Sequence, residues 1–419
     1  MDRHPGAGHV AVTWKDYTII WSGTCADPTF VNYHLHGEWV WQKTSGDLPE
    51  NHYFATAVVI KDNMVVVGGG WRVNTNYVYM LDLKVWSWTK VTPGGIAPLM
   101  HTQGCSSWVY KNKMYCFGGE IYDHEGDLSS YPSYLEVSSD TEYTNQLFCY
   151  NITTNCWEWP NVDGEIPQPR AYHATIINSY TVFLFGGDMQ INDLHILDMV
   201  SLRWKRVHGP GPDTSTLRVP NAREGHSLAL ISPSKAILFG GMFCYHSIPS
   251  YLRDCWLLDL DKAKGNQEIS SIWKQIQSDS SEERTCHKAL VEPVSQRLWL
   301  IGGNQCSKVE TMTVNVVPLK VLAMECVVGK IRVDDPMLKA SPKMLKKDID
   351  TYRSSFDPVL CGPLQCGPYT GLPFPETSEG EDCDESDDEG LENSIADAAL
   401  DLAASLLFCL VSYVPIKYF

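Results

Sequence analysis

Basic residues are scarce in this chain of 419 residues, which has 33 Lys and Arg against 50 Asp and Glu and a net charge of −17. General binding to nucleic acid or to an anionic membrane needs a basic surface, so both classes of partner are disfavoured. The acidic excess is unevenly placed, because twelve acidic residues and no Lys or Arg lie within 371–401. The rest of the chain is therefore only mildly acidic. With 44% apolar residues overall, it can form a large core.

Paired-cysteine motifs and export signals are also missing. The 14 Cys are scattered without a Cys-x-x-Cys, and the N-terminus lacks the basic and apolar regions of a signal peptide. We therefore interpret the thiols as reduced and mostly buried, and we expect a cytoplasmic or nuclear protein. The apolar stretch 402–416 is shorter than the roughly 20 residues of a membrane-spanning helix, so a membrane anchor is not expected.

Catalytic and cofactor motifs are absent as well. The double glycines do not form a phosphate-binding loop, and there is no Gly-x-Ser-x-Gly or His-Glu-x-x-His. His34 and His36 form the one tight histidine pair, and without an identifiable third ligand we interpret them as surface histidines. The sequence therefore predicts a protein that is not an enzyme and that holds no cofactor or metal.

What the chain does contain is a repeat. Short apolar runs ending in two glycines, or in Ser-Gly for the first, start 46 to 68 residues apart: TIIWSG (18–23), MVVVGG (64–69), MYCFGG (114–119), VFLFGG (182–187), AILFGG (236–241) and LWLIGG (298–303). An Arg/His pair precedes three of them: Arg170 with His173, Arg223 with His226, and Arg284 with His287. A strand-like segment, often ending in Leu-Asp, follows most runs, and tryptophans come after it.

These marks predict an all-β fold built from similar four-stranded sheets. Runs of 4–6 apolar residues suit strands buried on both faces, and paired glycines let the backbone turn close to a neighbour. The tryptophans would fill the wide outer space between sheets. We expect His173, His226 and His287 to hold strands together, since they occupy equivalent positions.

The repeat resembles the kelch family of β-propellers, within it the group of kelch domain-containing proteins 1 and 2. The likeness is carried by GHVAV (8–12), WVYKNKMYCFGG (108–119), PRAYHATII (169–177), INDLHILD (191–198) and GHSLALISPSKAILFGG (225–241). It implies a six-bladed propeller over 5–317. Few residues precede the first blade, and no Trp-bearing fourth strand follows TMTVNVV (311–317), so how the ring closes is left open.

A propeller of this kind presents loops around a central binding site, so protein or peptide ligands are expected. The candidate pocket residues are Arg170, Arg223, Arg284, Tyr172 and Glu224. Arginines lining a pocket would favour an acidic or carboxylate-bearing peptide; alternatively they form ion pairs within each blade, with Asp82, Asp198 or Asp259. The relatives' arginines after the double glycine of blade four are replaced here by Asp188, Met189 and Gln190. Glu224 stands where the relatives' pocket serine is expected, so a preference for a diglycine carboxylate is not carried over.

The segment 318–350 is predicted to form two short amphipathic helices. The resemblance implies that it docks elongin B/C and a cullin, as in substrate receptors of cullin-RING ubiquitin ligases. Leu322 and Cys326 match the elongin-binding box only loosely, and Leu345 belongs to a similarly degenerate cullin box. A kelch scaffold unrelated to ubiquitin is the alternative function. Residues 351–395 are predicted to be a disordered Pro/Gly-rich and then acidic linker, and 396–419 an apolar C-terminal segment.

Overall fold

The computed structural model describes sixteen stretches between residues 6 and 315: 6–23, 27, 29–35, 38–49, 52–70, 77–98, 103–121, 131–138, 142–188, 191–208, 219–245, 248–265, 267–276, 282–293, 297–304 and 309–315. These belong to one compact unit of the chain. The predictions for 318–350, 351–395 and 396–419, including Leu322, Cys326 and Leu345, lie outside the described residues. Among the residues that the structure describes, no helix is long and apolar enough to cross a membrane.

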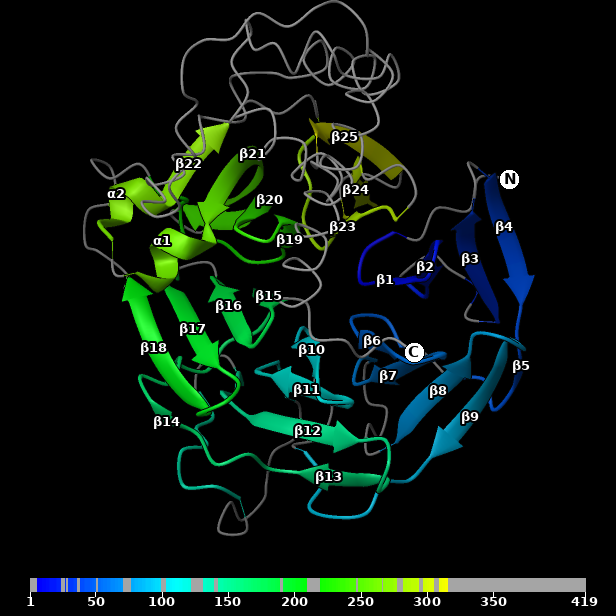
Figure 1. Cartoon of the computed structure of the whole chain (residues 1–419). Coiled ribbons are helices and arrows are strands. Elements are labelled where there is room, and N and C mark those ends of the chain that lie inside the picture. The colour runs from blue at the N-terminus through cyan, green and yellow to red at the C-terminus, as the bar shows by residue number, and fades with distance from the viewer. Residues whose placement is uncertain are drawn as a thin grey trace, which may run out of the picture. The chain divides into compact units, whose positions relative to one another are not determined.

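The described strands form six sheets, antiparallel apart from one short outer strand in each of two sheets, and the sheets follow one another around a ring (Figure 1). Blade 1 contains β1 (Val10–Trp14), β2 (Tyr17–Trp21), β3 (Phe30–Leu35) and β4 (Glu38–Lys43). Blade 2 contains β5 (Ser45–Gly46), β6 (Thr56–Ile60), β7 (Asn63–Val67), β8 (Val78–Asp82) and β9 (Ser87–Val91). Blade 3 contains β10 (Ser106–Tyr110), β11 (Lys113–Phe117), β12 (Leu147–Asn151) and β13 (Cys156–Glu158).

The other half of the ring follows the same order. Blade 4 contains β14 (Asp163–Gly164), β15 (Ala174–Asn178), β16 (Thr181–Phe185), β17 (Leu194–Asp198) and β18 (Arg203–His208). Blade 5 contains β19 (Ser227–Ser232), β20 (Lys235–Tyr245), β21 (Ile248–Asp259) and β22 (Trp273–Ile276), with α1 (Leu260–Lys264) and α2 (Ile269–Ile272) between the last two strands. Blade 6 contains β23 (Lys288–Val291), β24 (Arg297–Ile301) and β25 (Val309–Asn315).

Each repeat of the sequence is one blade. Every apolar run that precedes a double glycine is the second strand of its sheet, and β1, β6, β10, β15, β19 and β23 line the centre of the ring (Figure 1). Five sheets contain the full set of four antiparallel strands, whereas the sixth has three among the described residues. The all-β propeller is thus confirmed, with five complete blades where six were expected.

The core lies between the blades rather than inside any one of them. Six apolar clusters join blades 1–2, 2–3, 3–4, 4–5, 5–6 and 6–1 in turn. Trp88, Trp157, Trp204 and Trp273 of the fourth strands are at most 4% exposed, as predicted for the outer space between blades. Trp41 of β4 is an exception, since 42% of it is exposed.

The ring closes by direct packing of blade 6 on blade 1. Ile20 of β2 packs with Trp299 and Ile301 of β24, and the Gly303 amide donates to the Gly6 carbonyl at 3.1 Å. His34 contributes to the same seam, with its ring centroid 4.5 Å from that of Trp299. His34 is only 8% exposed, so its interpretation as a surface histidine is wrong. Its neighbour His36 lies outside the described residues.

Three blades are also linked at their outer edges. The chain leaving blade 1 forms β5, which pairs in parallel with β9 of blade 2, and β14 pairs with β18 of blade 4 in the same way. An equivalent bridge joins Gly94 to Cys156 of blade 3. Each link carries a Gly-x-x-Pro sequence, beginning at Gly46, Gly95 and Gly164. These links join each blade to the next along the chain without a helix.

Candidate functional site

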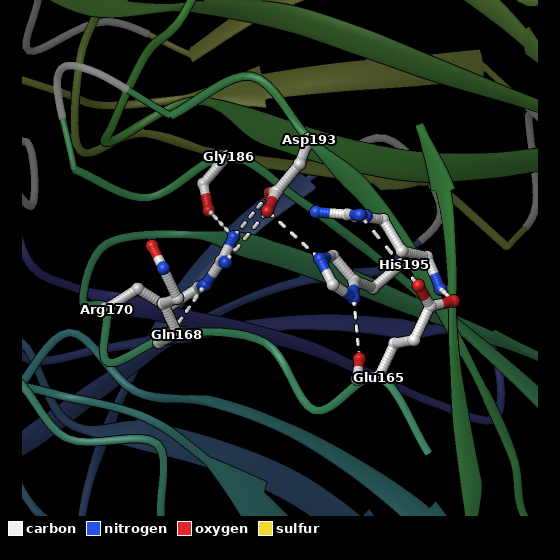
Figure 2. Close-up of polar contacts among 7 residues, drawn as sticks. Glu165, Gln168, Arg170, Gly186, Asp193 and His195 are labelled. Atoms are coloured by element: carbon white, nitrogen blue, oxygen red, sulfur yellow. Dashed lines mark hydrogen bonds and ion pairs between the residues drawn. The ribbon is translucent and has the colours of Figure 1, made fainter. Parts of the chain in front are cut away.

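The three repeated arginines are built into the blades. Arg170, Arg223 and Arg284 are completely buried. Nη1 of Arg170 lies 2.9 Å from the Gly186 carbonyl and 2.6 Å from Oδ1 of Asp193, and Nη2 lies 3.0 Å from Oδ2 of Asp193 (Figure 2). A bidentate pair of this kind holds the loop before β15 against the double glycine of the same blade.

The second arginine repeats the arrangement. Arg223 forms a bidentate pair with Asp254 at 2.7 and 2.8 Å and donates to the Gly240 carbonyl at 2.9 Å. Arg284 donates to the Gly302 carbonyl at 3.2 Å. The prediction that these guanidiniums line a pocket therefore needs correction, because all three are buried and those of Arg170 and Arg223 are paired inside their blades. Ion pairing was the other alternative, but the partners of the first two are Asp193 and Asp254 rather than Asp198 and Asp259.

The arginine segments also join neighbouring blades. The amide of the second glycine in a blade donates to the arginine carbonyl of the next blade, from Gly187 to Arg223 at 3.0 Å and from Gly241 to Arg284 at 2.7 Å. The following histidine supports the same seam, since Nε2 of His287 lies 2.8 Å from the Ser227 hydroxyl. We expected these histidines to bond strands within one blade, whereas His287 joins blade 6 to blade 5.

Electrostatics within the Arg170 group keep its carboxylate charged. Burial alone would raise the pKa of Asp193, but hydrogen bonds from His195 and Arg170 outweigh it and hold that pKa well below the ordinary value. His195 in turn lies 3.1 Å from the Glu165 carbonyl (Figure 2). The group is thus a closed network, with its donors and acceptors used inside the blade.

A second ring of residues lies two positions after the arginines. We call it the axial ring: Gly8, Phe54, Gly104, Tyr172, Gly225 and Cys286, one from each blade. Five backbone hydrogen bonds of 2.7 to 3.3 Å run from blade to blade along it, each amide donating to the carbonyl of the neighbouring member. All six residues have positive φ. The axial ring therefore fixes the blades at the centre independently of their side chains.

Glycines and larger residues alternate around the axial ring for a steric reason. A Cβ on Gly104 would lie 2.8 Å from the Tyr172 ring, and one on Gly8 would lie 2.9 Å from the Phe54 backbone. The aromatic side chains thus lie over the neighbouring glycines, and the two rings meet edge to face at 5.6 Å. Phe54, Tyr172 and Cys286 hold left-handed conformations that favour glycine, which is typical of residues kept for their side chains.

Three carboxylates gather beside this ring, and we call them the carboxylate cluster: Glu120, Asp188 and Glu224. Glu120 and Asp188 directly follow the double glycines of blades 3 and 4, and Glu224 follows Arg223 in blade 5. Glu120 accepts a 2.7 Å hydrogen bond from the Tyr172 hydroxyl. The backbone of Glu224 is held by paired hydrogen bonds with Met242, at 3.0 and 2.9 Å.

Glu224 is the unusual member of the cluster. Its side chain belongs to a residue only 6% exposed, and its Oε2 has no hydrogen-bond partner. Burial raises the pKa of Glu224 to about 7, and the charges of Asp188 and Glu120 add to the effect. A buried carboxylate oxygen without a partner costs folding free energy, so it calls for an explanation beyond the fold.

The neighbouring thiol of Cys286 is held in its protonated form at neutral pH. Burial raises the pKa of Cys286 to about 11, with the Glu224 charge contributing. The described part of the chain also contains no group of three or more His, Cys, Asp or Glu placed to hold a metal ion. The seven cysteines described, among them Cys286, are all free thiols.

Of the predicted site residues, the structure therefore brings Tyr172 and Glu224 together near the centre and places Arg170, Arg223 and Arg284 inside the blades. Sequence reasoning missed Glu120, Asp193 and Asp254. A signal for Glu120 existed, because it occupies the same repeat position as Asp188, directly after a double glycine. Asp193 and Asp254 share a repeat position as well, each five residues before the aspartate that ends the third strand of its blade.

Similar proteins agree with this architecture. Residues 8–218 match the family model described as the KLHDC2/KLHL20/DRC7 Kelch-repeats domain. Kelch domain-containing protein 2 of Bos taurus is 30% identical over 282 residues, which cover 61% of this chain and 67% of that protein. Kelch domain-containing protein 1 of Mus musculus is 25% identical over 324 residues, which cover 71% of this chain and 75% of that protein. The solved structure of YjhT, 18% identical, superposes with a TM-score of 0.56 over 73% of this chain and 93% of that one, a likeness of fold alone.

Proposed function

Because the chain belongs to the KLHDC2/KLHL20/DRC7 family of kelch-repeat domains, we propose that its propeller binds a protein or peptide partner at the carboxylate cluster. The observation that carries this proposal is Glu224, a buried carboxylate with an oxygen that the fold does not use. A scaffold stabilised only for itself would replace such a group by a neutral one. The protein then acts by binding rather than by catalysis.

We further propose that the partner is a substrate of a ubiquitin ligase and that this chain is the substrate-recognition subunit of a cullin-RING complex. Support comes from the sequence of 318–350, in which Leu322 with Cys326 resembles an elongin-binding box and Leu345 lies in a sequence similar to a cullin box. Elongin B/C and a cullin are the corresponding partners. Such a complex works in the cytoplasm or nucleus, in line with the free thiols of the described residues.

The alternative proposal is a kelch scaffold without a ubiquitin ligase. It is favoured by the loose match of both boxes and by Asp188 and Glu224, which stand where the resemblance leads one to expect basic or neutral residues. The two proposals share the binding site and differ only in the adaptor.

Affinity purification of the full chain followed by mass spectrometry separates them. We expect elongin B/C and a cullin with the unmodified chain, and their loss in the double variant Leu322→Ser/Leu345→Ser. The matched control is Leu338→Ser, which changes an apolar residue of the same segment outside both boxes. Absence of every ligase subunit from the unmodified sample would leave the scaffold as the function.

A further inference from the structure

We propose that Glu224 recognises a primary carboxamide of the partner, the side chain of an Asn or a Gln, through paired hydrogen bonds to its carboxyl group. This inference rests on the proposed function of peptide binding and deepens it, because it names the chemical group that the site takes. Glu224 is the residue that carries it, and Glu120 and Asp188 enter only as the surroundings of that side chain.

Glu224 is fixed in position while its carboxyl group is left without a partner. Its backbone pairs with that of Met242 at 3.0 and 2.9 Å, and the residue is only 6% exposed. Its Oε2 is buried without a hydrogen-bond partner, and among the described residues none forms a hydrogen bond or an ion pair with this carboxyl group. A ligand therefore gains a hydrogen-bonding group that binding does not have to order first.

The other two acids of the cluster are engaged within the protein. Glu120 accepts the 2.7 Å hydrogen bond from the Tyr172 hydroxyl. Both Glu120 and Asp188 have further interactions with the rest of the chain. Their contribution to the site is negative charge beside Glu224, which makes the ionisation of its carboxyl group harder.

No cation among the described residues offsets this effect. Lys288, on the innermost strand of blade 6, lowers the pKa of the Cys286 thiol, but the charges that act on Glu224 are those of Asp188 and Glu120. Burial and these two acids raise the pKa of Glu224 to about 7. Its carboxyl group therefore keeps its proton up to about neutral pH.

A protonated carboxyl group presents an O–H donor and a carbonyl acceptor side by side. A primary carboxamide presents the complement, because one N–H and the C=O lie on the same side of its C–N bond. A trans peptide bond holds these two groups on opposite sides, so it satisfies only one of them. An ammonium group has donors only, and a ligand carboxylate would be repelled by Asp188 and Glu120. The carboxamide is thus the group that satisfies both oxygens.

The residues around Glu224 favour a neutral ligand group on a peptide. Met242 lies directly opposite Glu224, so the two side chains lie on the same face, and the Cys286 thiol beside them stays protonated. Beyond the double glycine, β20 and β21 continue as a hairpin that contains Met242 and Phe243, both half-buried. A charged side chain would lose its hydration in these surroundings, whereas the hairpin offers apolar contacts to residues that flank a carboxamide.

The test is selection from randomised octapeptides with the full-length chain. Five libraries carry Gln, Asn, Glu, Lys or Leu at a fixed central position, with acetylated N-termini and with neither Asn nor Gln elsewhere. We expect the Gln or the Asn library to be retained at least about tenfold over the other three. Replacing the selected residue by its N,N-dimethylamide, which has no N–H, should lower the affinity at least about tenfold.

Variants of Glu224 then identify the protein group that reads the carboxamide. Glu224→Gln should keep the preference, because its side chain also presents a donor and an acceptor, whereas Glu224→Leu should lower it at least about tenfold. The affinity of the unmodified chain should fall between pH 6 and pH 8.5, as Glu224 loses its proton, and that of Glu224→Gln should stay constant. Glu283→Gln, which changes an exposed acid before β23, is the control and should behave like the unmodified chain.

Retention of peptides without a preference for a carboxamide, or with a preference for Lys or Glu, would overturn the inference and leave peptide binding intact. A preference that survives in Glu224→Leu would also overturn it. Retention of no peptide at all would overturn both proposals.

Discussion

Neighbouring residues 223 and 224 have opposite roles in blade 5. The Arg223 guanidinium is neutralised by Asp254 and hydrogen-bonded to the Gly240 carbonyl, so it stabilises the blade. The Glu224 carboxylate is buried beside two other acids. The Arg and His of the motif Arg-x-x-His stabilise the blade. The two residues between them can therefore vary and contribute to ligand binding.

Glu224→Gln should stabilise the ligand-free protein at high pH. The folded protein holds a proton on Glu224 up to about pH 7, whereas an unfolded glutamate releases it near 4.5. Between these values the folded state binds more protons, so stability falls as pH rises. The shift corresponds to at most about 3 kcal/mol above pH 7. Denaturant unfolding of both proteins at pH 4.5 and pH 8 checks it, and an equal difference at the two pH values would contradict it.

Arg170→Met should destabilise blade 4 by about 3–5 kcal/mol, because it leaves the buried Asp193 carboxylate without its bidentate partner. The matched control is Arg203→Gln in the same blade, whose 2.8 Å contact to Asp163 joins two exposed side chains. That change should cost less than about 1 kcal/mol. Unfolding of both variants in guanidinium chloride measures the two losses of stability. Similar losses in the two variants would refute the structural role of Arg170.

The arginines could be found from the sequence, but their partners could not. Asp198 and Asp259 stand out because they follow a leucine at the end of a strand, where each accepts backbone hydrogen bonds at the following turn. Asp193 and Asp254 lie five residues earlier, Asp193 just before β17 and Asp254 within β21. Which end faces the guanidinium depends on the antiparallel register, and that is a property of the assembled sheet.

At the scale of strands, the apolar runs and double glycines predicted the second strand of every blade, because burial on both faces requires an uninterrupted apolar run. The extension of β20 and β21 was not predicted. Pro249 and the polar residues around it are typical of a loop, and the strand tolerates Pro249 because it lies exposed near the hairpin tip. The two-residue links β5 and β14 are too short to leave a strand pattern.

Gly164→Ala should therefore be costly even though β14 is so short. A Cβ at Gly164, whose φ is +89°, would lie 2.1 Å from the Trp204 carbonyl oxygen. We expect a loss of about 2 kcal/mol or more, since both the conformation and the close approach exclude a side chain. Gly265→Ala is the control: it ends α1 with a φ of −82° and should change stability by less than about 1 kcal/mol. Thermal unfolding of the two variants measures this difference in stability. Equal melting temperatures for the two variants would contradict the prediction.

Histidines at the seams between blades should make the propeller sensitive to acid. Burial lowers the pKa of His9 and of His226 to about 3 each, from an ordinary 6.5. Between these values the unfolded chain binds more protons, so stability falls as pH falls below 6.5. The slope is up to about 1.4 kcal/mol per pH unit for each histidine. Denaturant unfolding between pH 7 and pH 4 measures it, and His226→Gln should reduce the slope; an unchanged slope would contradict this origin.

At the scale of the whole molecule, the ring depends on six seams rather than on one central core. The repeat predicted the propeller and the kelch family, which the family match confirms. It could not predict the closure, because Gly303 meets Gly6 only after the ring is complete. It predicted Glu224 and Tyr172 as site residues but not the role of Glu120, since the acids come from three different blades.

The charge of the axial end therefore differs from the charge that the repeated arginines suggested. Arg170 and Arg223 pair with aspartates of their own blades, and Glu120, Asp188 and Glu224 lie beside the axial ring. The central claim is that a protein or peptide partner binds at the carboxylate cluster.

The most direct measurement is selection from a randomised octapeptide library with the full-length chain. One selected peptide is then bound to the unmodified chain and to Asp188→Lys, by fluorescence polarisation at fixed pH and ionic strength. Asp188 is a half-buried member of the cluster, and the reversal adds a positive charge there. The unmodified chain should bind the peptide, and the variant should change the affinity at least about tenfold, equivalent to about 1.4 kcal/mol. An affinity that stays the same in the variant would contradict binding at the carboxylate cluster.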